Sequence, residues 1–67
     1  MKKYGENLKY YRENNNLSQL ELAKHTGLSQ QAISLWEKDV CEPTLSKLIL
    51  IAVFFGVSID YLAGLEL

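Results

Sequence analysis

The chain has 67 residues, of which 48% are hydrophobic and 22% are charged, and its formal net charge at pH 7 is −1. A chain of this length buries only about 60% of its unfolded surface, so it has room for one small core and no second domain. The single cysteine, Cys41, excludes an intramolecular disulfide and a cysteine zinc site. We therefore expect one domain over residues 1–67, with a free thiol in a loop.

Two features bear on where the protein acts. The apolar run from Leu48 to Phe55 is too short to span a bilayer, and the N-terminus lacks the apolar stretch of a signal peptide. We therefore expect a cytoplasmic protein that does not enter a membrane.

The charges are unevenly distributed along the chain. All seven Lys and Arg residues lie at or before Lys47, together with six of the eight acidic residues, so the last third is acidic. Proteins that bind nucleic acid are often strongly basic, which this chain is not. Any affinity of this chain for nucleic acid that does not depend on sequence is therefore expected to be modest, with few phosphate contacts.

The apolar pattern predicts five helices, over residues 4–14, 18–26, 29–37, 44–55 and 58–63, and no strand. The first helix ends at a polar break from Asn14 to Asn16, because asparagine tolerates the left-handed conformation that closes many helices. Pro43 precedes the fourth helix, Gly56 ends it, and Ser58 starts the fifth. The pattern is typical of an all-α protein.

The second helix has clear start and stop signals. Ser18 and Glu21 have the spacing of a capping box, and Leu22 and Ala23 supply the apolar face. Gly27 ends the helix because glycine adopts the left-handed conformation at no steric cost. Ser29 follows as the cap of a third helix, so the two helices are joined by one tight turn.

The third helix has two different faces. Ala32, Ile33 and Trp36 fall on one side and are expected to face the core. The opposite face is polar at its start and consists of Gln30, Gln31, Ser34 and Leu35. An outward face that begins with two glutamines suggests recognition of base edges.

The fourth helix is apolar nearly all round, which a small domain cannot bury alone. The expected inner stripe is Leu45, Leu48, Ile51, Ala52 and Phe55. This leaves Leu50, Val53 and Phe54 facing outward, with Leu65 and Leu67 expected nearby. Self-association is the simplest explanation, and a different protein partner, such as a toxin or an antirepressor, is the alternative.

The spacing of Ala23, Gly27, Ile33 and Trp36 resembles the helix-turn-helix of lambda-repressor-like proteins of the Cro and XRE type. The resemblance extends over nearly the whole chain, to Leu8, Arg12, Glu37, Pro43, Leu48, Ala52 and the sequence GVSIDYL. It implies a compact five-helix lambda-repressor-like DNA-binding domain, with the motif over residues 19–38. It also implies that the third helix enters the major groove of double-stranded DNA.

Within this family resemblance, Gln30 and Gln31 are the expected base contacts, because glutamine can bond bidentately to adenine N6 and N7. Ser34 and Leu35 share their face, and Leu35 either packs on a thymine methyl group or is an ordinary exposed leucine. The alternative for the glutamines is that they are ordinary surface amides.

The expected phosphate contacts are Ser18, Gln19, Ser29, Lys38 and Arg12. The resemblance implies that the starts of the second and third helices clamp the DNA backbone. Ser18 is already explained as a helix cap, whereas Gln19 has no evident structural role and is the better candidate. Many family members have Asn-Gly and a basic residue after the third helix. This chain has Lys38, Asp39 and Val40, then Glu42, so Lys38 is the basic side chain that remains.

The resemblance also implies an ion pair between Arg12 and Glu37 that leans toward the DNA. The alternative is that they are two independent surface charges. Trp36 is expected in the core. His25 has no spaced metal ligand or nucleophile nearby and is expected to be a solvated helix residue.

No catalytic constellation is evident, so we expect no enzyme activity, cofactor, metal site or small-molecule substrate. The sequence therefore predicts a transcriptional regulator, a repressor that occupies a palindromic operator as a homodimer. The alternative is a protein-interaction module of the same fold that binds a partner through the fourth helix and contacts DNA weakly.

Overall fold

The computed structural model describes residues 4–64 and contains five α-helices in this range, with no strand. They are α1 (Tyr4–Asn14), α2 (Gln19–Thr26), α3 (Gln30–Glu37), α4 (Leu45–Phe55) and α5 (Ile59–Ala63). The predicted all-α class is confirmed. The predicted first residues of the last four helices, Ser18, Ser29, Thr44 and Ser58, are the cap residues immediately before them.

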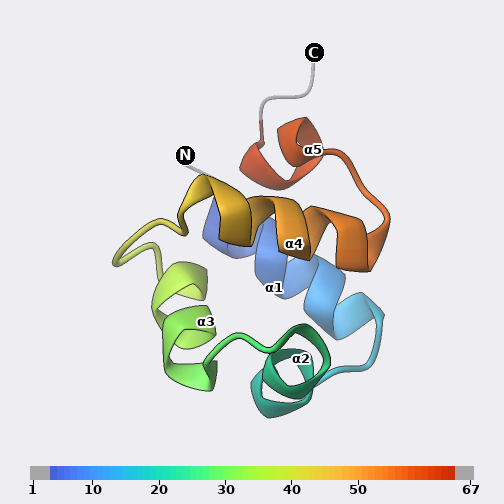
Figure 1. Ribbon diagram of the computed structural model, residues 1–67, viewed down its shortest axis with the longest axis vertical. Coiled ribbons are helices and arrows are strands. Elements are labelled where there is room, and N and C mark those ends of the chain that lie inside the picture. Colours follow the sequence, from blue (N-terminus) through green and yellow to red (C-terminus); the bar gives the residue numbers. More distant parts are fainter. Residues whose placement is uncertain (1–3, 65–67) are drawn as a thin grey trace.

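The five helices enclose one core (Figure 1). α2 and α3 pack against each other at one end of the molecule, α5 lies at the other end, and α1 and α4 lie between them. α1 packs against both α3 and α5, and α4 packs against α2 and α5. The helix-turn-helix is therefore held against the rest of the core by two contacts, that of α3 with α1 and that of α2 with α4.

The core takes side chains from every helix. Its fully buried members are Tyr4, Leu8, Leu22, Ile33, Ile51 and Leu62. Trp36 is buried as predicted, with 3% of its surface exposed. Ala32, on the predicted inner face of α3, is partly buried and packs against this core.

Two helices end on a residue other than glycine in the left-handed region, Asn16 with φ 56° and Asp39 with φ 58°. In each case the next amide donates back to the carbonyl five residues earlier, from Leu17 to Arg12 at 3.1 Å and from Val40 to Leu35 at 3.0 Å. This is the Schellman ending that usually employs glycine. The prediction for the asparagine break is confirmed, whereas the left-handed Asp39 was not foreseen.

The inner stripe of α4 differs from the prediction at one position. Leu48, Ile51 and Ala52 are buried and Phe55 packs against the core, but Leu45 is 67% exposed. The prediction that Leu45 faces inward was wrong. Leu45 is the first residue of the helix and lies at the rim of the apolar arc, so the helix does not turn it onto the core.

Candidate nucleic-acid interface

The geometry of α2 and α3 is set by hydrogen bonds at their starts. The Oγ of Ser18 accepts from the amide of Glu21 at 3.0 Å, and the amide of Ser18 donates to Oε1 of Glu21 at 2.8 Å. This is the predicted capping box. Hydrogen bonding by the backbone amide of Ser18, and to a smaller extent by its side chain, stabilises the carboxylate of Glu21 and lowers its pKa. The Oγ of Ser29 accepts from the amide of Ala32 at 3.0 Å.

The turn between the two helices is equally well defined. Gly27 has a φ of 76°, as expected for the glycine that ends α2. Its amide donates to the carbonyl of Ala23 at 2.8 Å. The caps and the turn therefore hold the first residues of α2 and α3 beside each other.

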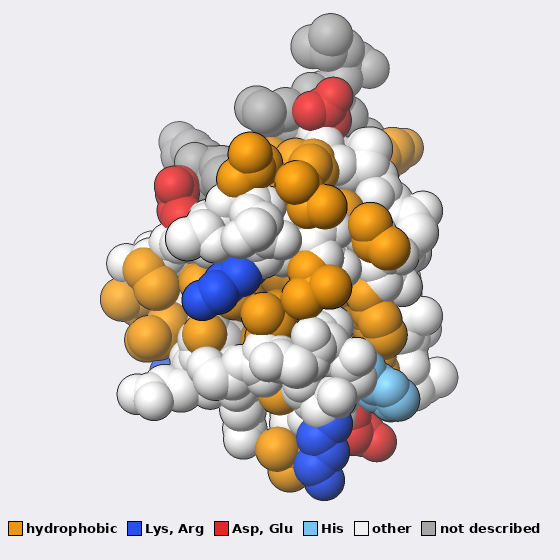
Figure 2. Space-filling model, in the orientation of Figure 1, with side chains coloured by type: hydrophobic (Ala, Val, Ile, Leu, Met, Phe, Trp, Pro, Cys, Tyr) orange, Lys and Arg blue, Asp and Glu red, His pale blue; other side chains and the backbone are white. Residues whose placement is uncertain are grey.

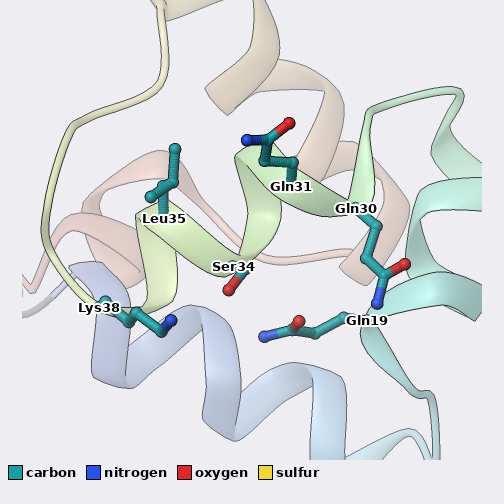
Figure 3. A pocket seen from close by; sticks show the side chains of 6 residues that line it. All are labelled: Gln19, Gln30, Gln31, Ser34, Leu35 and Lys38. Carbon is teal, nitrogen blue, oxygen red and sulfur yellow. The ribbon is translucent and has the colours of Figure 1, made fainter.

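A surface hollow of about 400 Å³ lies between the two helices (Figure 3). It is lined by Gln19, Gln30, Gln31, Ser34, Leu35 and Lys38. Every one of these residues was assigned from the sequence to a DNA contact. In Figure 3 the side chains of Gln19 and Gln30 lie beside each other at the starts of their helices, and that of Lys38 extends below α3 toward Gln19.

The hollow has the chemistry of a polar recognition surface. Gln30, Gln31 and Lys38 are exposed, and Ser34 and Leu35 are half-buried. A glutamine amide both donates and accepts hydrogen bonds, whereas lysine only donates and is positively charged. The amides therefore suit the edges of bases, and the ammonium group suits a phosphate.

A buried ion pair lies beneath this surface. The Nε of Arg12 donates to Oε2 of Glu37 at 2.6 Å, and its Nη2 donates to Oε1 at 3.1 Å. Only 10% of the Arg12 side chain and 4% of the Glu37 side chain are exposed. The predicted bridge is confirmed, and the alternative of two independent surface charges is wrong. The hydrogen bond with Glu37 also raises the pKa of Arg12.

The same network connects the helices to one another. Nη1 of Arg12 donates to the carbonyl of Leu17 at 2.8 Å, which fixes the entry to α2. The amide nitrogen of Gln19, Nε2, donates to Oε1 of Glu37 at 3.0 Å. One carboxylate of α3 therefore binds a side chain from α1 and a side chain from α2.

The bond between Gln19 and Glu37 corrects one expectation. Gln19 was singled out because it had no structural role, but it is half-buried and has a structural partner. It still lines the hollow, so its phosphate contact stays a prediction. Local spacing could not reveal a partner 18 residues away.

A further contact that sequence reasoning missed involves the loop after α3. The amide of Gly5, in the first turn of α1, donates to Oδ1 of Asp39 at 3.1 Å. The signal in the sequence is the departure from the family pattern at Asp39, which by itself indicates only a loss of favourable charge.

The outward residues predicted for α4 are exposed. Leu50 is 41% exposed, Val53 is 73% exposed and Phe54 is 39% exposed. Ile49 adds a further 43% exposed side chain, and Leu45 joins the same surface. Figure 2 shows hydrophobic side chains across this face of the molecule. We call the exposed residues Leu45, Ile49, Leu50, Val53 and Phe54 the α4 face. Leu65 and Leu67, which were expected nearby, lie outside the described residues.

His25 is exposed, as expected, but it is not surrounded only by solvent. Its ring stacks on that of Phe54, with centroids 5.9 Å apart and an angle of 28° between the planes. The contact joins α2 to α4 and partly covers Phe54. Val53, which is 73% exposed, is therefore more accessible than Phe54, which is 39% exposed.

Residues 4–64 contain no group of three or more His, Cys, Asp or Glu residues that could hold a metal ion. They also contain no helix of the length and apolarity needed to cross a membrane. Cys41 is an exposed free thiol, as expected.

Similar proteins show which family shares this arrangement. The chain is 49% identical over 53 residues to an uncharacterized HTH-type transcriptional regulator of Methanocaldococcus jannaschii, an alignment that covers 79% of this chain and 80% of the relative. It is 40% identical over 65 residues to the HTH-type transcriptional activator BcrR of Enterococcus faecalis, covering 96% of this chain and 32% of that protein. An uncharacterized HTH-type transcriptional regulator of Bacillus subtilis, YobD, is 31% identical to the chain over 62 residues. This alignment covers 92% of this chain and 55% of YobD.

The chain thus spans about a third of BcrR and about half of YobD, but most of the Methanocaldococcus protein. No solved structure matches it with comparable significance. A family model described as helix-turn-helix matches residues 8–62, which include the caps, the hollow and the buried ion pair. The chain therefore belongs to the helix-turn-helix family, of the Cro and C1 type.

Proposed function

We propose that this protein binds double-stranded DNA sequence-specifically, with α3 in the major groove, and regulates transcription as a repressor by occupying an operator. The observation that supports this most is the hollow, because it gathers polar side chains from both helices of the motif on one surface. Two of the similar proteins are named as transcriptional regulators and one as a transcriptional activator, which also supports regulation of transcription. Because such a regulator acts on the DNA of its cell, the proposal includes a cytoplasmic location.

The proposal gives the lining residues two roles. Gln30 and Gln31 bind base edges, with Ser34 beside them and Leu35 against a thymine methyl group. The proposed phosphate contacts are Lys38, Gln19 and the caps Ser18 and Ser29, with the helix amides beside these caps. Arg12 contributes only through the small part of its side chain that remains exposed.

Selection of bound sequences from random duplex DNA at low salt tests this function. Low salt suits the experiment because a chain of net charge −1 should make few phosphate contacts. We expect enrichment of one palindromic sequence. The matched control is the double variant Gln30→Ala/Gln31→Ala, which should still bind DNA weakly but enrich no sequence. Equal enrichment by both proteins would contradict the roles of the glutamines, and no enrichment by the native chain would contradict the function.

The palindrome follows from a second part of the proposal, a two-fold homodimer formed through Leu50, Val53 and Phe54. The α4 face supports this because a closed symmetric contact removes exposed apolar surface that would otherwise favour aggregation. Two recognition helices in successive major grooves would place the half-site centres about one helical turn, roughly 34 Å, apart.

Sedimentation of a charged variant tests the dimer. Val53→Glu places two like charges in the contact, so this variant should sediment as a monomer with an unchanged helical circular dichroism spectrum. The control is Leu20→Glu, because Leu20 is 47% exposed and belongs to α2, so it is not one of the residues of the α4 face. The control should remain a dimer. A native chain that is monomeric at high micromolar concentration would refute the dimer.

The α4 face also supports a second candidate function, a protein-interaction module that binds a different partner there and contacts DNA weakly. The exposure of Val53 and Ile49 favours this candidate. It predicts a monomer that enriches no DNA sequence. The two experiments above therefore separate the candidates without knowledge of the partner.

A further inference from the structure

The loop that follows α3 is attached to the start of α1 by one side chain. Oδ1 of Asp39 accepts the amide of Gly5 at 3.1 Å, across 34 positions of sequence. That amide belongs to the first turn of α1, where backbone donors have no partner within the helix. Asp39 therefore acts as a cap for a helix that is distant in the sequence, and its negative charge suits the positive end of the helix dipole.

The backbone of Asp39 makes this contact specific to a few residue types. Its φ of 58° is a conformation that glycine, asparagine and aspartate tolerate best. Its own amide donates to the carbonyl of Trp36 at 3.0 Å, and the next amide, of Val40, donates to that of Leu35. Glycine would satisfy this turn but has no side chain to reach α1. Aspartate satisfies the turn and also makes the connection.

Gly5 is matched to this arrangement. A Cβ at this position would lie 2.6 Å from the carbonyl oxygen of Glu37 and 2.8 Å from both carboxylate oxygens of Asp39. The start of α1 therefore contacts the last turn of α3 directly, with no room for a side chain. The contact fixes the end of the recognition helix on a second helix of the core.

Lys38 lies between Glu37 and Asp39, both of which are held by contacts with α1. It is the cap residue of α3, immediately after Glu37 and before Asp39, and its exposed side chain lines the hollow. Glu37 is held by the buried ion pair, and Asp39 is held by α1. The backbone of Lys38 is therefore anchored on both sides.

We propose that Asp39 is a positioning residue, which holds Lys38 where its ammonium group meets a DNA phosphate. This inference rests on the proposed function of the hollow. It opposes the simpler view of Asp39, in which a carboxylate beside the binding surface only repels phosphates. The two views predict effects of opposite sign when the side chain is removed.

The deciding variants are Asp39→Gly and Asp39→Asn. Asp39→Gly keeps the left-handed turn and loses the bond to Gly5, whereas Asp39→Asn keeps both the turn and an acceptor oxygen. Both remove the charge. If the charge only repels DNA, both variants bind more tightly and by the same factor, which would overturn the proposal.

If Asp39 positions Lys38, Asp39→Gly binds operator DNA more weakly than the native chain, and Asp39→Asn binds at least as tightly. The salt dependence identifies the lost contact, because each phosphate contact contributes about 0.9 to the slope of log K against log salt. The magnitude of this slope should decrease by about this amount for Asp39→Gly, as it should for Lys38→Ala. In the Lys38→Ala background, Asp39→Gly should cause no further loss of affinity, and an undiminished further loss would also overturn the proposal.

Amide hydrogen exchange separates failure of this inference from failure of the proposed function. The Gly5 amide should be protected in the native chain and in Asp39→Asn, and should exchange faster in Asp39→Gly, whether or not DNA binds. Unchanged protection in all three would overturn the attachment itself. If the attachment is present but the native chain binds no DNA, the proposed function is wrong and the positioning role is rejected with it.

Discussion

Replacing Glu37 with alanine should destabilise the protein by much more than the loss of a surface ion pair. Glu37 accepts two hydrogen bonds from Arg12 and one from Gln19, and only 4% of its side chain is exposed. The substitution leaves the guanidinium charge of Arg12 buried without its partner. Breaking a buried pair in this way costs about 3–5 kcal/mol, compared with about 0–1 kcal/mol for an exposed pair.

This cost is large for a domain of this size. At roughly 0.05–0.15 kcal/mol per residue, the free energy of unfolding of a chain this long is about 3–10 kcal/mol. Glu37→Ala therefore removes a large part of the stability and leaves some molecules unfolded at room temperature. Urea unfolding followed by circular dichroism, at a temperature at which the native chain is most stable, gives the difference.

A double-mutant cycle isolates the pair from other effects of the substitution. The single variants are Arg12→Met and Glu37→Met, because methionine retains much of the volume of either side chain. Each single variant should be strongly destabilised, whereas the double variant should recover much of the loss, since an apolar replacement of both partners leaves no buried charge. Losses that simply add, with no coupling energy, would refute the reasoning.

Four further outcomes follow from the structure. Gln31→Ala should cost about 1–3 kcal/mol of binding free energy on the selected site and much less on random DNA, and equal losses in a binding titration would contradict base recognition. Gln19→Ala should weaken binding to both DNAs, and an unchanged affinity for random DNA would contradict the phosphate role. Gly5→Ala should lower the free energy of unfolding by about 1–3 kcal/mol, because the added methyl group overpacks against the backbone of Glu37. Alanine is otherwise the better helix former, so a variant that is more stable in urea unfolding would contradict the close approach. Burial, followed by the charge of Glu37, raises the pKa of the Tyr4 hydroxyl, so the folded state favours its neutral form. Stability is therefore lost as the pH rises above the unfolded pKa of about 10. Tyr4→Phe should abolish this part of the alkaline unfolding, measured by circular dichroism against pH.

Much of the fold was predictable because its signals are local. The capping box of Ser18 and Glu21 and the left-handed Gly27 lie within a few residues of the helix ends that they define. Periodicity also separated Gln31 and Leu35 from Ile33 and Trp36, so the part of the lining that α3 contributes was anticipated from spacing. The other two lining residues, Gln19 and Lys38, were anticipated through the family resemblance. Hydrophobic spacing failed at Leu45 because a position at the edge of a stripe depends on how far the neighbouring helices extend over the first turn.

The contacts that position the site were not predictable from spacing. Gln19 meets Glu37 across 18 positions, and Gly5 meets Asp39 across 34. The first pair depends on the packing of α2 against α3 and the second on the packing of α1 against α3, and local spacing encodes neither. The ion pair of Arg12 with Glu37 was anticipated only through the family resemblance. It is a pairing of the same kind, separated by 25 positions.

The carboxylate shared by Arg12 and Gln19 has a consequence for retargeting this protein to other DNA sequences. Gln30 and Gln31 are exposed at the start of α3, so libraries of substitutions at these two positions leave the core unchanged. Gln19 lines the same hollow but also binds Glu37, so a substitution there changes the support of the site together with its surface. A designer who alters specificity should therefore randomise the two glutamines of α3 and keep Gln19, Glu37 and Arg12 together as an invariant frame.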